Sequence, residues 1–226
     1  MANVDQQLLG KLKEIDVSFD KAIDELYREK DSRVFFALSH GYITKKIAKH
    51  IGLFNAPNPL IELNNSFALE FINAINGHPH AGWTAAFRRC DVLDEYAARA
   101  KDPLSSLSML PLLPYTATAF EQCAGCMAYV HISQDLKKAL QKVRNVDAQD
   151  YGNVLVFVLE GHLFAEVKCR GAGMGAAVFM IGHLIMEWLN SNAKRWRNEA
   201  FQEVYKKQVP DPSVKFLKAY RAAEGR

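Results

Sequence analysis

Residues 148–169 read AQDYGNVLVFVLEGHLFAEVKC, and they indicate the fold class more clearly than any other part of the chain. Residues 154–159 would be apolar on nearly every side of a helix, and a helix of that kind lies at the centre of a bundle. Asp147 stands directly before the stretch and can cap its first turn. We therefore predict a buried helix over residues 148–169.

The rest of the chain follows the same helical pattern. Apolar residues recur at three- and four-residue spacing, and the alternation typical of strands is nearly absent. We predict one all-α domain over residues 1–226, a bundle of about seven to eight helices. The helices are expected at about 5–30, 32–52, 60–76, 81–100, 116–143, 148–169, 175–208 and 213–223. Those at 116–143, 148–169 and 175–208 should form the core, with the helix at 5–30 peripheral and 211–226 a short C-terminal helix and tail.

Composition and charge exclude several classes of protein. Of 226 residues, 49% are hydrophobic and 23% are charged, which is typical of a globular domain rather than a disordered chain. A net charge of +3 is too small to indicate a nucleic-acid partner. The uncharged run at 171–186 is shorter than the ~20 residues that a bilayer span needs, so no transmembrane segment is predicted. The polar N-terminus does not read as a secretory signal, and a cytoplasmic location is expected.

The four cysteines are expected to be free thiols, because a reducing compartment disfavours disulfides. They are Cys90, Cys123, Cys126 and Cys169. Cys123 and Cys126 form a C-x-x-C motif, but no strand precedes it and no second pair accompanies it, so it is a weak sign of redox chemistry or of zinc. All four are interpreted as small core residues, and the role of the C-x-x-C pair stays open.

A candidate acid–base pair lies on the helix at 116–143. His131 and Asp135 are four residues apart, so their side chains can meet on one face of the helix. A carboxylate at that distance would select the tautomer of the imidazole and raise its pKa. On the helix at 60–76, Asn64 shares a face with Phe67, where an amide would either fix the packing or orient a ligand.

Two further histidines repeat this four-residue spacing to an acid. The three pairs are His131 with Asp135, His162 with Glu166, and His183 with Glu187. Three pairs exceed what the proportion of acids would give by chance, and all lie on the predicted core helices. A histidine and a carboxylate one helical turn apart can share a metal ion, so a zinc or iron site built from these six residues is an alternative. Three local pairs without a common centre are the favoured interpretation, and no cofactor is predicted.

Three segments, taken in order, resemble a mostly bacterial family of all-α domains of unknown function. FFALSHGYIT at 35–44 is similar to the family's VFALAYLRIT, and LNNSFALEFINAI at 63–75 resembles LDVVFANRYFDAL. Trp83, Ala86 and Phe87 follow in a W-x-x-A-F pattern, and HISQDL at 131–136 resembles HINLDL. The resemblance covers about residues 33–136. It implies an all-α fold and singles out His131 and Asp135 as matching polar positions.

The chain departs from this family at three polar positions. Asn64 stands where the family has Asp, His40 where it has Tyr, and Tyr129 where it has Asn. If the family's Asp were a general base, Asn64 could not replace it, so a lost or changed chemistry is implied.

Three functions are consistent with these patterns, and whether the protein is an enzyme stays open. The first is acid–base catalysis of the isomerase, cyclase or lyase type on a hydrophobic small molecule held between core helices. His131 and Asp135 would be catalytic, and the substrate would contact Asn64, Tyr129, His40, Phe67 and Trp83. The second is a metal-dependent hydrolase or oxygenase using the His/acid pairs. The third is a non-catalytic module that binds a lipid, a pigment or a partner. A homo-oligomer is possible in each case.

Overall fold

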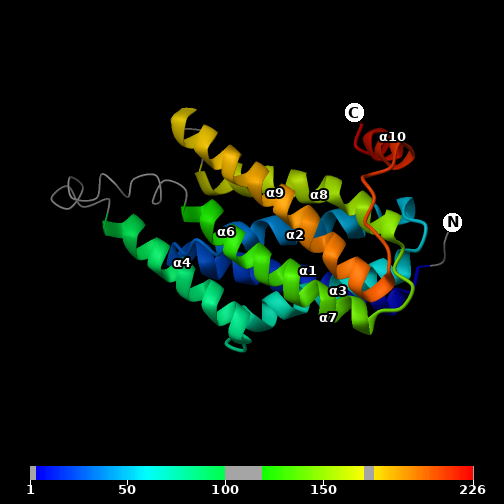
Figure 1. The fold of residues 1–226 in the computed structure, drawn as a ribbon, viewed down its shortest axis with the longest axis horizontal. Coiled ribbons are helices and arrows are strands. Elements are labelled where there is room, and N and C mark those ends of the chain that lie inside the picture. Colours follow the sequence, from blue (N-terminus) through cyan, green and yellow to red (C-terminus); the bar gives the residue numbers. More distant parts are fainter. Residues whose placement is uncertain (1–3, 100–118, 171–175, 226) are drawn as a thin grey trace.

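The structure is a computed structural model, and it describes residues 4–99, 119–170 and 176–225. Within these ranges the side chains of residues 96–99, 119–121, 170, 176–187 and 189 lie outside the described part. The described residues form helices and their connections, with no strand among them, which confirms the predicted all-α bundle (Figure 1). The elements are α1 (Gln6–Glu29), α2 (Val34–Lys49), η1 (Ile51–Leu53), α3 (Pro57–Ile75), α4 (Ala81–Arg99), α6 (Ala119–Val130), η3 (His131–Asp135), α7 (Leu136–Lys142), α8 (Ala148–Arg170), α9 (Ala176–Tyr205) and α10 (Val214–Ala223).

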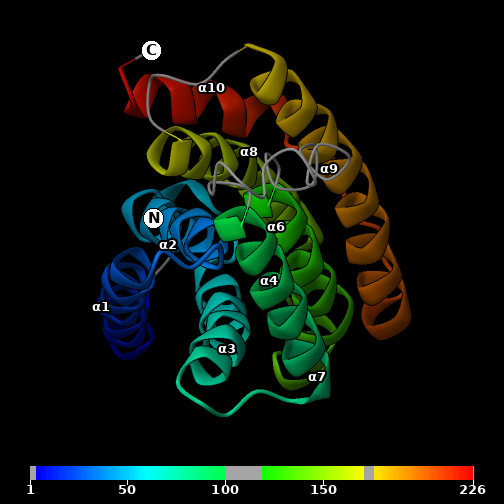
Figure 2. The ribbon, with the colours of Figure 1, turned by 90° about the vertical axis from the view of Figure 1, so that its left-hand side faces the viewer.

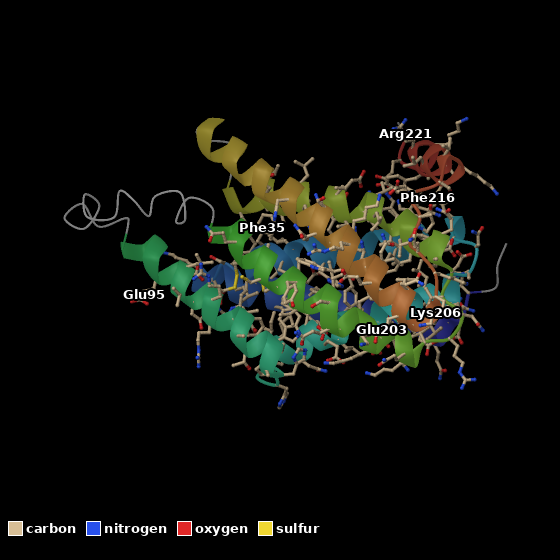
Figure 3. All side chains as sticks on the ribbon, in the orientation of Figure 1. Phe35, Glu95, Glu203, Lys206, Phe216 and Arg221 are labelled. Carbon is tan, nitrogen blue, oxygen red and sulfur yellow. A yellow bond between two sulfur atoms is a disulfide. The ribbon has the colours of Figure 1, made fainter. Side chains whose placement is uncertain are left out.

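Helix α2 lies inside the bundle. It packs most extensively against α8 and α1, and it also contacts α3 and α6, while α4 packs on α6 and α7 on α9. Figure 2 shows α1 at one side of the molecule and α9 at the other, with α2 between them. Phe35 of α2 is fully buried and lies among the helices in Figure 3, whereas Glu203 and Lys206 lie near the surface.

The core is therefore wider than the predicted set of three helices. Helix α2 buries residues along most of its length, including Phe35, Ala37 and Leu38, and α3 contributes Phe71. Helix α8 buries Phe157 completely, but it does not lie at the centre of the bundle. Its apolar residues Leu159, Leu163 and Val167 are 58%, 57% and 62% exposed and form a stripe along one face. A helix that is apolar on all sides can be buried on any side. Which sides are covered depends on where the neighbouring helices pack.

A glycine allows α2 and α8 to approach closely. A Cβ atom added at Gly161 would lie 2.8 Å from the backbone oxygen of Ser39, a separation that Cβ atoms essentially never show. Because the obstacle is backbone, the clash could be relieved only by moving one helix away from the other. The close crossing places Ser39 and His40 of α2 beside His162 of α8, around the cavity described below.

We expect Gly161→Ala to lower the free energy of unfolding by about 1–3 kcal/mol, the cost typical of overpacking. Gly125→Ala is the matched control, because Gly125 is also helical and a Cβ there would meet nothing within 4 Å. Alanine has the higher helix propensity, so the control should gain up to about 1 kcal/mol. Urea unfolding followed by circular dichroism measures both variants. If both variants gained the same free energy of unfolding, the crossing of α2 and α8 would not require a glycine.

The prediction of four free thiols is wrong. Cys90 of α4 and Cys123 of α6 are both fully buried and form a disulfide (the yellow bond in Figure 3). Cys126 and Cys169 are free. Helices α4 and α6 lie against each other, and this packing brings together two cysteines that are 33 residues apart in the sequence. Disulfides persist mainly in oxidising compartments, so this bond weighs against the expected cytoplasmic location.

Among the described residues, no helix combines the length and the apolar composition needed to cross a membrane. The uncharged run at 171–186, for which no transmembrane segment is predicted, lies partly outside the described residues.

Candidate functional site

The centre of the site is an irregular turn. The sequence predicts one continuous helix over 116–143, but the structure divides it into α6, a π-helical turn over His131–Asp135 (η3) and α7. A π-helical turn inserts an extra residue into the helix and often lies at a functional site. Here it contains both members of the predicted acid–base pair.

His131 and Asp135 are in contact, as their spacing predicts. Nδ1 of His131 lies 3.1 Å from Oδ2 of Asp135, and the two residues are 2% and 0% exposed. Burial alone would raise the pKa of Asp135, but the hydrogen bonds and charges of His131 and His80 outweigh it and leave this pKa lowered. The carboxylate is therefore ionised and can only accept, so Nδ1 of His131 carries the proton and Nε2 is left with a lone pair.

Asp135 raises the pKa of His131 as predicted, but the net shift of this pKa is downward. Burial lowers it, and this effect exceeds the opposite effect of the hydrogen bond and charge of Asp135. The imidazole is consequently neutral at pH 7, which is the form that can accept a proton.

Two distant residues complete the surroundings of Asp135. The indole Nε1 of Trp83 donates to Oδ2 at 2.9 Å, and Nε2 of His80 lies 2.9 Å from Oδ1. Trp83 was predicted to contact substrate, but it is fully buried, does not line the cavity and instead holds the carboxylate. His80 is not among the site residues predicted from the sequence. It lies in a loop 55 residues before Asp135, and no short-range pattern indicates this contact.

A small cavity of about 80 Å³ lies beside His131. It is bounded by α2, α3, α8, α9 and the segment around η3, and most of its wall is apolar. Nε2 of His131 is buried and has no hydrogen-bond partner. On one side the His131 ring stacks on Phe67, with ring centroids 3.5 Å apart. The volume is about half of the ~150 Å³ of an engineered apolar cavity that admits benzene.

Three of the predicted substrate contacts line this cavity, namely His40, Asn64 and Phe67. The His40 ring lies 4.8 Å from the His131 ring, and burial, followed by the charge of His131, holds the pKa of His40 well below its usual value. Asn64 is anchored by a 3.4 Å hydrogen bond from its Nδ2 to Oγ1 of Thr44.

Tyr129 does not belong to the cavity. It is 49% exposed and its ring packs against Trp196, with centroids 5.1 Å apart. Two residues along a helix correspond to roughly 200° of rotation, so a side chain two positions before His131 points away from the face that carries His131.

The six predicted metal ligands do not gather into one centre within the described part of the chain. His162 lines the cavity with its Nδ1 unpartnered, and Glu166 is buried but does not line the cavity. The side chains of His183 and Glu187 lie outside the described residues. A different group of three does approach ligand spacing, because atoms of Glu70, His80 and Asp135 lie within 4.8 Å of one another.

Lysines already compensate the negative charge of Glu70 and Asp135. Lys138 Nζ lies 3.6 Å from Asp135, and Lys142 Nζ lies 3.6 Å from Glu70. A divalent cation would have to compete with both ammonium groups, so the arrangement favours an ion-pair network over a metal site.

Comparisons of this chain with protein-family models, with curated proteins and with solved structures found no match. The family resemblance of residues 33–136 therefore stays a prediction.

Proposed function

We propose that this protein is an acid–base enzyme of the isomerase, cyclase or lyase type, which acts on a small, largely apolar molecule held in the cavity. The observation that carries the proposal is the state of His131. Its Nδ1 lies against a buried carboxylate, its Nε2 is buried and unpartnered, and the residue lines the cavity. A buried nitrogen without a partner is costly, and a ligand that supplies the missing proton donor would remove that cost.

The roles of the surrounding residues follow from their contacts. His131 would accept a proton from the substrate at Nε2 and return it at another position. Asp135 would stabilise the imidazolium formed in between, with Trp83 and His80 holding the carboxylate in place. Asn64 is within the cavity wall and would orient the substrate through its amide. The apolar wall would exclude water from the proton transfer.

Binding without chemistry is the second candidate. The cavity is small and mostly apolar, which is typical of a site that simply retains a ligand. Metal-dependent hydrolysis or oxygen chemistry, with zinc or iron, is the weakest of the three, because the predicted pairs do not converge among the described residues.

Proton exchange in D₂O tests the first candidate without knowledge of the substrate. We expect the protein to accelerate deuterium uptake at the acidic C–H bonds of small carbonyl compounds, for which acetone, butanone and pyruvate are suitable probes, because the cavity is too small for a six-membered ring. His131→Gln should lower the accelerated rate by about 10²–10⁴-fold, the usual contribution of a general base. Proton NMR follows the loss of the C–H signal.

His78→Gln is the matched control, because His78 is an exposed histidine in the loop before α4. The His78→Gln protein should catalyse deuterium uptake at the wild-type rate. A folded His131→Gln protein with full exchange would exclude His131 as the base. Binding of the probes without any exchange by the wild type would favour the non-catalytic candidate.

A further inference from the structure

A buried cation faces the cavity from α9. Arg197 lines the cavity and is only 7% exposed. Its Nε is buried without a hydrogen-bond partner, and Arg197 forms no ion pair with any described residue. An arginine remains protonated inside proteins, so this side chain brings a full positive charge to a mostly apolar site.

The other polar groups of the cavity cannot neutralise this charge. The described residues that line the cavity include no Asp or Glu. His162 is held neutral, because burial and then the charge of Arg197 lower its pKa to about 4. Burial raises the pKa of Tyr151 to about 12, with a smaller opposite effect of Arg197, so the phenol is also neutral.

An uncompensated buried charge is expensive. Burial lowers the pKa of Arg197, which is the direction expected for a cation taken out of water with no described carboxylate beside it. Proteins seldom retain such a group unless it is paired, and a charge kept at a cost to stability is typical of a functional site.

We infer that the cavity binds a small apolar monocarboxylate whose carboxylate group is neutralised by Arg197. This inference rests on the proposed function and specifies its substrate class. The guanidinium of arginine matches a carboxylate with two parallel hydrogen bonds. The described residues of the cavity offer one cation and enclose about 80 Å³, which suits one singly charged group on a short apolar body better than a doubly charged phosphate. Ser39 Oγ and His40 Nε2, both buried without partners, are further polar atoms of the cavity residues.

Paired acids and amides test the charge of the ligand on the unaltered protein. Acetate, propionate and butyrate are compared with acetamide, propionamide and butyramide by isothermal titration calorimetry. Each amide has the size of its acid and lacks the charge. The wild type should bind at least one acid ten-fold or more tightly than the matching amide. Equal affinities within every pair, or no binding of any probe, would overturn the inference.

Variants of Arg197 assign the preference to that residue. Arg197→Met keeps most of the length of the side chain and removes the charge, so the preference for the acid should disappear. Arg197→Lys keeps the charge and should retain part of the preference. Because Met removes an unpaired buried cation, the melting temperature of Arg197→Met without ligand should equal or exceed that of the wild type. An unchanged acid preference in Arg197→Met, or a markedly lower melting temperature in both variants, would overturn the assignment.

His131→Gln separates this inference from the proposed function. It should keep the acid preference, since Arg197 is intact, while it loses deuterium exchange. An acid preference without exchange in the wild type would leave the carboxylate site standing and remove the acid–base enzyme. Deuterium exchange by a wild type that does not prefer the acids would leave the acid–base enzyme standing and remove the carboxylate site.

Discussion

Asp135→Ala should lower the free energy of unfolding by about 3 kcal/mol or more, one of the two largest effects expected in this protein. The substitution leaves the Trp83 indole N–H and the His131 Nδ1–H buried without an acceptor, and each such group costs about 1–3 kcal/mol. The carboxylate is 0% exposed, so water cannot easily replace it. Urea unfolding at pH 7 measures the loss.

The matched control for this substitution is Asp211→Ala. Asp211 is likewise paired with a lysine, at 2.7 Å from Lys194 Nζ, but its side chain is 74% exposed. An exposed ion pair of this kind contributes about 0–1 kcal/mol. If both substitutions cost the same, Asp135 does not act as a buried acceptor.

The effect of Asp135 also has a predictable pH dependence. Its pKa is lowered in the folded protein, so its stabilising contribution is present above the ~3.9 of a free aspartate and is lost as the pH falls through the folded value. The difference between wild type and Asp135→Ala should therefore be constant near neutral pH and shrink below about pH 4. A difference that grew on acidification would contradict the direction of this shift.

Loss of the Cys90–Cys123 disulfide should be the second large effect. The bond joins residues 33 positions apart, and closing a loop of that length in the unfolded chain corresponds to roughly 3–4 kcal/mol at 25 °C. We expect the Cys90→Ala/Cys123→Ala double variant to lose about that much stability under non-reducing conditions. Guanidinium unfolding with and without dithiothreitol is the measurement.

Reduction provides the internal comparison for the disulfide. Dithiothreitol should lower the free energy of unfolding of the wild type nearly to that of the double variant. It should not change the free energy of unfolding of the double variant. Cys126→Ala is the control, because this free cysteine belongs to the same C-x-x-C motif. Mass spectrometry that found four free thiols in protein purified without reductant would contradict the bond itself.

Helix boundaries could be predicted closely from the sequence, because they depend on neighbouring residues. The helix predicted at 148–169 is observed as Ala148–Arg170, and Asp147 accepts hydrogen bonds from the backbone at its start as expected. The helix predicted from residue 60 begins earlier, at Pro57, since proline is well suited to a first helical turn. Hydrogen bonds within a helix reach four residues, so short-range patterns contain most of the information.

The central pair of the candidate site was predictable for the same reason. His131 and Asp135 are one turn apart, and this spacing alone brings their side chains within reach. The π-helical geometry of that turn was not predictable, and neither was the direction of the His131 pKa. Both depend on how completely the surrounding helices cover the turn, which no local pattern records.

Only the tertiary structure decided which distant residues meet. Trp83 and His80 reach Asp135 across 52 and 55 residues, and Arg197 reaches the cavity from α9. The Cys90–Cys123 disulfide likewise follows from the packing of α4 on α6. The sequence by itself determined the helices and the one-turn pair, because these are local. The partners of that pair and the charge in the cavity depend on which helix faces dock together, and such docking is set by the fit of whole surfaces rather than by spacing along the chain.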